Sequence, residues 1–134
     1  MSNEKLRVLM VEPGKKACPA EIGRELEDLQ KAVGGWIEAY YPFEDEACII
    51  CNDEGKYNGM KPNRTIRDSK GTVIDIIYGP FFICGIGEER FESLPDELMD
   101  KYQEMFRLPE AFIKTPKGIL STVYEPIEEG GEVK

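Results

Sequence analysis

The chain carries its longest nearly apolar run within Val73-Ile-Asp-Ile-Ile-Tyr-Gly-Pro-Phe-Phe-Ile-Cys-Gly-Ile86. The eleven residues from Ile76 to Ile86 are too few for a membrane span, which needs roughly 17 to 25 residues. β-Branched and aromatic residues on both sides of Gly79-Pro80 are typical of strands. The stretch therefore predicts buried core, formed either by one bent strand or by a tight hairpin at Gly79-Pro80.

Upstream of this stretch, the pattern predicts three more strands and one helix. The predicted strands are apolar, β-branched or aromatic and cover Leu6–Glu12, Trp36–Phe43 and Ala47–Cys51. Leu26, Leu29 and Val33 recur at helical spacing, and Gly34-Gly35 follows as a left-handed helix terminator. The segment between the first strand and this helix, Pro13–Gly23, holds two prolines and two glycines and is interpreted as a loop.

Downstream, a second helix and a last strand are expected. Ser93 resembles an N-cap with Asp96 three residues later, and Leu98, Tyr102 and Met105 form an apolar helical stripe that ends before Pro109. A last strand is predicted over 118–124. Residues 125–134 are acidic and glycine-containing with little to bury, so we expect a disordered tail.

These elements predict an α+β fold in the order β-α-β-β-loop-β-β-α-β. We expect a mostly antiparallel sheet with both helices packed on one face. The length is that of a single globular domain over 1–124, with a core that does not need disulfides or metals.

Charge and composition exclude several classes of function. The chain has 134 residues, 17 basic and 26 acidic side chains and no histidine, so its formal net charge is −9. The missing histidine removes the commonest general base and metal ligand. A strongly negative protein repels nucleic acid and anionic membranes and attracts cationic surfaces. We therefore expect a binding protein, not an enzyme, with no cofactor, no membrane partner and no nucleic-acid coating role.

The four cysteines do not predict a metal site. Cys48 and Cys51 have the spacing of half a zinc site, but residues three apart on a strand point to opposite faces, and Cys18 and Cys84 are isolated. Because the apolar run at Leu6–Val11 is short, no signal peptide is expected. We expect reduced, buried cysteines and a cytoplasmic location.

A basic segment at 55–71 contrasts with the acidic chain. It contains five basic residues against Asp68, a local charge of +4. Glycines at both ends allow close backbone approach, and arginines clamp anions bidentately. The segment predicts a site for a small anionic, nucleotide-like ligand, with contacts from Lys56, Tyr57, Asn63, Arg64 and Arg67. The alternative is that its arginines pair with the protein's own acids.

An acidic segment from Glu88 to Glu104 supports a second hypothesis. Seven acids against two bases give it a local charge of −5. Such a face can imitate a phosphate backbone and occupy the basic groove of a host enzyme. The candidate contacts are Glu92, Asp96, Glu97, Asp100 and Glu104. The alternative is a solvated helix surface with early acids favoured by the helix dipole. An enzymatic hypothesis needs other acid–base groups, for which Asp53, Glu54 and Lys56 are the candidates.

Four blocks follow one another along the chain: Leu9-Met-Val-Glu-Pro13, Gly34-Gly-Trp-Ile-Glu-Ala-Tyr-Tyr-Pro-Phe43, Cys51-Asn-Asp-Glu-Gly-Lys56 with Pro62-Asn-Arg64, and Tyr78-Gly-Pro-Phe-Phe-Ile-Cys-Gly85. Together they resemble an uncharacterised bacterial and phage family, domain-of-unknown-function family 3846, over about 6–109. The resemblance implies an accessory or anti-defence protein of a phage or mobile genetic element, and brings no catalytic residues. The predicted partner is an anionic small molecule or a host defence protein, and the oligomeric state stays open.

Overall fold

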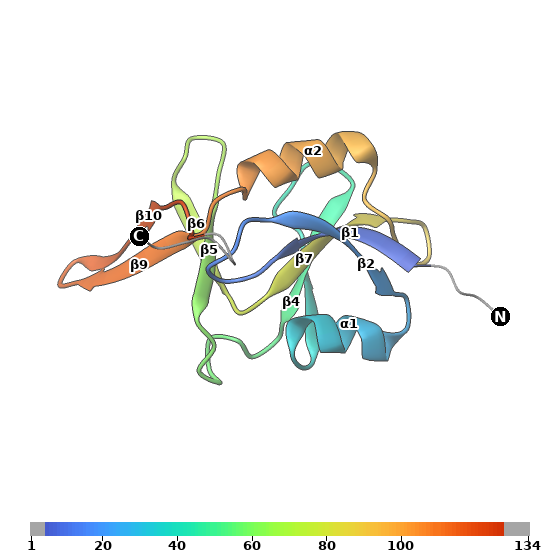
Figure 1. Ribbon diagram of the computed structural model, residues 1–134, viewed down its shortest axis with the longest axis horizontal. Helices are drawn as coiled ribbons and strands as arrows, with labels where there is room; N and C mark the ends of the chain where they lie inside the picture. Colours follow the sequence, from blue (N-terminus) through green and yellow to red (C-terminus); the bar gives the residue numbers. More distant parts are fainter. Residues whose placement is uncertain (1–4, 128–134) are drawn as a thin grey trace.

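The computed structural model describes residues 5–127, which form a central antiparallel sheet, two smaller two-stranded sheets and two helices (Figure 1). The central sheet has the strand order β2-β1-β7-β4-β3, and the short β8 also pairs with β7. Its strands are β1 (Lys5–Val11), β2 (Cys18–Gly23), β3 (Ile37–Tyr40), β4 (Ala47–Asn52), β7 (Phe81–Ile86) and β8 (Phe91–Glu92). The α+β class and the mostly antiparallel pairing are confirmed.

β7 lies at the centre of this sheet. Its first five residues are buried, and it pairs antiparallel with β1 on one side and β4 on the other. The preceding strand, β6 (Val73–Tyr78), pairs instead with β5 (Pro62–Arg67) in a separate sheet. Gly79, with a φ of 81° that favours glycine, is therefore a corner between two sheets. The hairpin alternative for Gly79-Pro80 is excluded because β6 and β7 do not pair with each other, and in place of one bent strand the chain forms two strands of different sheets joined by a bend.

The two helices cover opposite faces of the central sheet (Figure 1). Leu29 and Val33 of α1 (Leu26–Val33) belong to one apolar cluster, whereas Met99 and Tyr102 of α2 (Asp96–Met105) belong to the other. The prediction that both helices pack on one face is wrong. The physical reason lies in the central strands, which are apolar on both sides, so that each face needs its own cover.

The predicted element order is also wrong, because four strands were not predicted. β2 lies in the segment interpreted as a loop, β5 lies in the basic segment, the short β8 precedes α2, and β9 (Glu110–Thr115) follows it. β2 pairs only with β1, and such an edge position tolerates proline and polar residues that hide the strand pattern. β10 (Gly118–Val123) confirms the last predicted strand.

The start of α2 also differs from its prediction. Its N-cap residue is Pro95, not Ser93. The Ser93 hydroxyl oxygen instead accepts a hydrogen bond from the backbone N–H of Arg7, at 2.9 Å, and so ties the segment before α2 to β1.

β9 and β10 form a hairpin that projects from the body of the protein (Figure 1). Its apolar side chains are largely exposed, including Ile113, Ile119, Leu120 and Val123. Within residues 5–127, no helix has the length and apolar character to cross a membrane. Most of the predicted tail, 128–134, lies outside the described residues, and Glu125 at its start pairs with Lys16 at 3.4 Å.

Candidate functional site

Two of the side chains predicted to bind an anion lie in the interior. Asn63 and Arg64 belong to β5, and their exposed fractions are 1% and 0%. The Arg64 guanidinium donates to the carbonyl oxygens of Lys15 at 2.7 Å and Phe106 at 3.0 Å and to Asn63 Oδ1 at 2.9 Å. Burial lowers the pKa of Arg64 to about 10, so the side chain stays charged at neutral pH. Both residues therefore stabilise the fold and are not at the surface to meet a ligand.

The other three predicted contacts are exposed, and the structure brings only two of them together. Lys56 and Tyr57 lie in the turn after β4 and line one small cavity, which Arg67 does not reach. Lys56 Nζ lies 3.1 Å from Asp75 Oδ1, and Arg67 Nη1 donates to the carbonyl of Gly71 at 2.8 Å. The five residues therefore do not form one anion site.

The thiols and the acid–base candidates are also placed by the structure. Cys48 and Cys84 are cross-strand partners, fully buried, with sulfur atoms 3.9 Å apart, and Cys51 is buried, whereas Cys18 is exposed. The prediction of buried cysteines thus holds for three of the four.

The acid–base candidates do not all meet. Asp53 lines the same small cavity as Lys56, whereas Glu54 is not among its lining residues.

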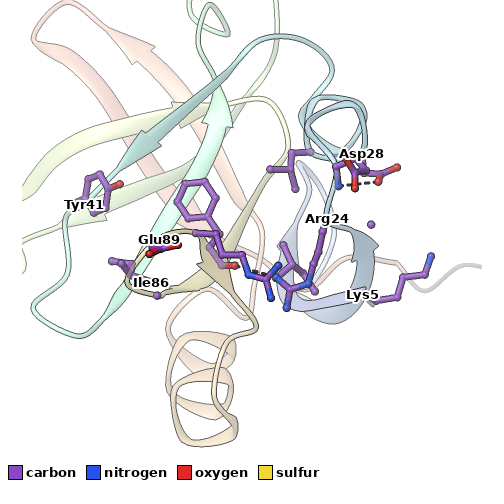
Figure 2. Close-up of a pocket in the computed structure, with 13 residues that line it drawn as sticks. Lys5, Arg24, Asp28, Tyr41, Ile86 and Glu89 are labelled. Carbon is purple, nitrogen blue, oxygen red and sulfur yellow. Dashed lines mark hydrogen bonds between the residues drawn. The ribbon is translucent and has the colours of Figure 1, made fainter. Parts of the chain in front are cut away.

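A larger pocket, of about 860 Å³, opens beside the first turn of α1 (Figure 2). We call it the α1 pocket. Its walls come from the start of β1, the turn between β2 and α1, α1 itself, the segment after β3 and the turn between β7 and β8. Its apolar and aromatic lining residues are Leu6, Leu29, Tyr41, Ile86 and Phe91. The volume is in the range of pockets that hold drug-sized ligands, about 300–1,000 Å³.

Three cationic side chains from three separate segments line the α1 pocket: Lys5, Arg24 and Arg90. In the view of Figure 2, Lys5 and Tyr41 lie at opposite ends and Arg24 lies between them. The Arg24 guanidinium is mostly buried and fixed, because Nη1 donates to the carbonyl of Phe91 at 3.1 Å and Nη2 lies 3.6 Å from Glu92. Its position is therefore set before any ligand arrives.

Three carboxylates also line the α1 pocket: Glu25, Asp28 and Glu89. The Asp28 carboxylate accepts a hydrogen bond from the backbone N–H of Glu25 at 3.1 Å, so it caps the start of α1. Glu25 and Glu89 are exposed at the rim. Charged groups of both signs therefore line the pocket beside its apolar wall.

Sequence reasoning missed the α1 pocket. Its cations are single residues next to acids in the chain, as in Arg24-Glu25 and Glu89-Arg90, so no local charge run marks them. They meet only because β1 and β7 are neighbours in the sheet and α1 packs over that face. The order of the strands was not available from the residue pattern.

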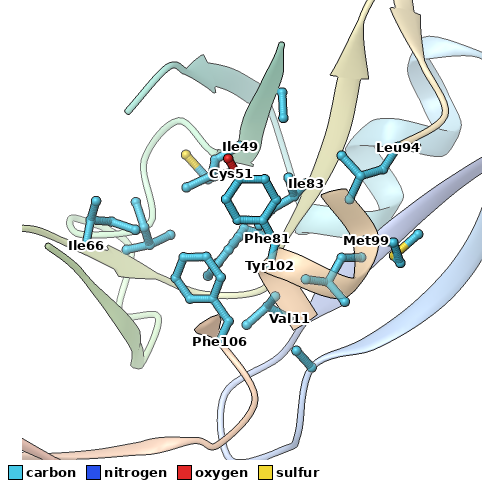
Figure 3. Packing of buried hydrophobic residues seen from close by; sticks show 14 residues of the cluster. Val11, Ile49, Cys51, Ile66, Phe81, Ile83, Leu94, Met99, Tyr102 and Phe106 are labelled. Atoms are coloured by element: carbon cyan, nitrogen blue, oxygen red, sulfur yellow. The ribbon is translucent and has the colours of Figure 1, made fainter. Parts of the chain in front are cut away.

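The acidic face of α2 is oriented by its packing. Figure 3 shows Met99, Tyr102 and Phe106 directed into the core with Phe81 and Val11. Phe43 stacks on the Tyr102 ring with centroids 4.3 Å apart, and the Tyr102 hydroxyl donates to Asp45 at 2.6 Å. Burial, followed by this hydrogen bond to a carboxylate, raises the pKa of Tyr102.

The five acidic residues predicted to contact a partner divide into two groups. Glu92 lies between Arg24 at 3.6 Å and Arg90 at 3.7 Å, and the exposed Asp96 pairs with Arg7 at 3.3 Å. The other three, Glu97, Asp100 and Glu104, are exposed and follow one another at spacings of three and four residues, which places them on one outward stripe of α2. Glu104 also lies 4.0 Å from Arg107 Nε.

Comparisons with curated proteins and with solved structures gave no match. A protein-family model, described as a domain of unknown function (DUF3846), matches residues 6–107. The matched region contains the whole central sheet except Lys5, both helices and the β5–β6 sheet, and it ends before the β9–β10 hairpin. The chain therefore belongs to the DUF3846 family.

Proposed function

We propose that this protein is a non-enzymatic binding protein that holds a small anionic, nucleotide-like ligand in the α1 pocket. The observation that carries the proposal is that Lys5, Arg24 and Arg90, from three separate segments, line one pocket of about 860 Å³ with an apolar and aromatic wall. The basic segment at 55–71 is not part of this site, because Asn63 and Arg64 are buried. An accessory or anti-defence role stays a prediction from the resemblance.

The chemistry of the wall suits a planar body carrying one anionic group. Leu6, Leu29 and Phe91 supply apolar contact, and the exposed Tyr41 ring is available to stack on a base. Arg24 and Arg90 bring guanidinium charge to the pocket, where both also contact Glu92, and guanidinium groups favour phosphate and carboxylate ligands. The Asp28 carboxylate accepts a hydrogen bond from the backbone at the start of α1.

Isothermal titration against the four nucleoside 5′-monophosphates and their nucleosides tests the proposal. We expect at least one monophosphate to bind and its nucleoside to bind about tenfold or more weakly, because a hydrogen bond to a charged group contributes about 1.5–3 kcal/mol. Arg90→Gln and Tyr41→Ala, both at exposed rim positions, should weaken this binding.

The matched control is Lys114→Gln, an exposed cation on the β9–β10 hairpin that removes the same charge as Arg90→Gln. It should leave binding unchanged. Absence of binding across the panel, or equal effects of Arg90→Gln and Lys114→Gln, overturns the proposal.

A second candidate function is a protein inhibitor that presents the outward stripe of α2 to a basic, nucleic-acid-handling host enzyme. The observation that favours it is the spacing of Glu97, Asp100 and Glu104. Like charges three or four residues apart destabilise a helix by a few tenths of a kcal/mol per pair, so the stripe has a cost in folding.

Charge reversal tests this candidate. Glu97→Lys with Asp100→Lys should abolish a low-salt complex with a basic partner from a bacterial lysate, and salt should weaken the wild-type complex. Glu21→Lys with Glu27→Lys changes the net charge equally at exposed positions of β2 and α1 and should preserve the complex. Equal losses in the two double variants exclude a specific role for α2.

A further inference from the structure

A second cavity, of about 280 Å³, lies between the β3–β4 edge, the turn after β4 and β6. We call it the tyrosine pocket because Tyr40, Tyr57 and Tyr78 line it. It shares no lining residue with the α1 pocket. The Tyr57 ring is 87% exposed at its mouth, whereas Cys51 and Ile77 are buried in its wall.

The charges around the tyrosine pocket are mostly negative. Among residues 5–127, its acidic lining residues are Glu38, Asp53 and Asp75, and its one basic lining residue is Lys56. Their sum is −2, in a chain whose net charge is −9. Both the local and the overall field therefore favour a cation at this site.

Asp75 already binds an ammonium group within this chain, that of Lys56. Its Oδ1 accepts hydrogen bonds from Lys56 Nζ at 3.1 Å and from the backbone N–H of Ile76 at 2.8 Å. The hydrogen bond to Asp75 raises the pKa of Lys56, and Tyr57 and Tyr78 act in the same direction. The Lys56 side chain is half exposed, so it can leave Asp75 for water.

The walls of the tyrosine pocket are held by backbone contacts. Asn52 Oδ1 accepts from the N–H of Glu54 at 2.8 Å, and Asn52 Nδ2 donates to the carbonyl of Val33 at 3.1 Å, which fixes the turn after β4. At Gly55 a Cβ atom would lie 2.7 Å from the carbonyl oxygen of Tyr78, so the turn lies directly against β6. The backbone of the turn and of β6 beside the cavity is therefore set by the fold, and the exposed side chains of Lys56 and Tyr57 lie at its edge.

We infer that the tyrosine pocket binds an alkylammonium group, with Asp75 as the charged acceptor, the tyrosine rings as a cation–π wall and Lys56 as an internal competitor. The volume is just below the range of drug-sized sites, about 300–1,000 Å³, so the pocket takes the charged end of a linear amine. The two sources of this group are a free amine and the lysine side chain of a polypeptide.

Titration with 1,4-diaminobutane and with an N-acetyl, C-amide lysine tests the inference and separates the two sources. We expect binding of at least one, and the tighter of the two identifies the source. Tyr57→Ala should weaken it about two- to fivefold, as expected for an exposed cation–π contact. Lys56→Gln should tighten it, because the competing ammonium is removed.

The sign of the Lys56→Gln effect is the sharpest readout, since an anion site at Lys56 predicts weaker binding of its ligand. Tyr41→Ala, which truncates another exposed tyrosine but in the α1 pocket, is the control and should not change amine binding. Binding of neither amine, or a loss of amine binding in Lys56→Gln, overturns the inference. Neither result affects nucleotide binding at the α1 pocket, so the two proposals fail separately.

Discussion

At the scale of single residues, the buried guanidinium of Arg64 joins three segments that are far apart in the chain. It lies in β5 and donates to backbone carbonyls of Lys15, after β1, and of Phe106, at the end of α2. These carbonyl oxygens have no helix or strand partner from the sheet pairing, so Arg64 completes their hydrogen bonding. Arg64, which was predicted to contact a ligand, thus links the β5–β6 sheet to the end of α2 by hydrogen bonds.

Arg64→Met should therefore lower the free energy of unfolding by about 3 kcal/mol or more, because several buried acceptors lose their donor together. Arg64→Lys should restore only part of the loss, since an ammonium cannot reproduce the planar fork. Urea unfolding measures both. The control is Arg67→Met in the same strand, which is exposed and should change stability by less than about 0.5 kcal/mol. Similar losses at the two positions contradict this role for Arg64.

Thiol reactivity is a second prediction at this scale. Burial, with smaller effects from Glu38, Asp75 and Asp53, raises the pKa of Cys51 to about 12. The folded protein thus binds the Cys51 proton more tightly than the unfolded chain, and this contribution to stability is present below pH 9 and is lost as the pH rises toward 12. A thiol-specific chromogenic reagent at pH 8 should modify Cys18 rapidly, and the other three thiols only after denaturation. Rapid reaction of two or more native thiols contradicts this expectation.

At the scale of elements, the residue pattern predicted those elements that bury apolar side chains by themselves. β4 and β7 are buried along almost their whole length, so their runs of apolar residues are unmistakable. β2 and β9 were missed because each is partly exposed and pairs with a single neighbour. β5 was missed because its buried residues include Asn63, Arg64 and Thr65, whose burial depends on partners elsewhere in the chain.

The same reason limited prediction of the sites. Lys56 and Tyr57 are adjacent in the sequence, and both lie at the tyrosine pocket. The α1 pocket takes its cations from residues 5, 24 and 90, which only the strand order brings together. The charged acceptor of the tyrosine pocket, Asp75, comes from β6, so the local signal at residues 56–57 marked only part of that site, and the α1 pocket left no local signal.

The β9–β10 hairpin gives a prediction at the element scale. Leu120 and Ile113 are cross-strand partners, and both side chains are more than half exposed. Leu120→Thr should therefore change the free energy of unfolding by less than about 0.5 kcal/mol. Ile49→Thr in the fully buried β4 should cost about 2 kcal/mol or more, because it buries a hydroxyl and removes apolar contact. Equal losses in urea unfolding indicate that the hairpin packs as part of the core.

At the scale of the whole molecule, the attractive ion pairs are local, whereas the repulsion comes from acidic residues spread over the surface. Many of the described cations are engaged locally, as in Lys56 with Asp75 and Lys101 with Asp45 at 2.6 Å. The surplus acids remain on outward surfaces such as the α2 stripe. The exposed ion pairs each contribute about 0–1 kcal/mol, whereas the repulsion among surplus acids acts over the whole surface.

Moderate salt should therefore stabilise this protein. Raising NaCl from about 0.01 M to about 0.2 M shortens the Debye length from about 30 Å to less than 10 Å and screens repulsion across the molecule. We expect the melting temperature, measured by calorimetry, to rise by about 2–5 °C, which corresponds to roughly 1 kcal/mol for a domain of this size. Glu97→Gln, Asp100→Asn and Glu104→Gln together change the net charge from −9 to −6. This triple variant should melt higher at low salt and respond less to added NaCl. A melting temperature that falls as salt is added would instead show that the attractive ion pairs outweigh the net repulsion.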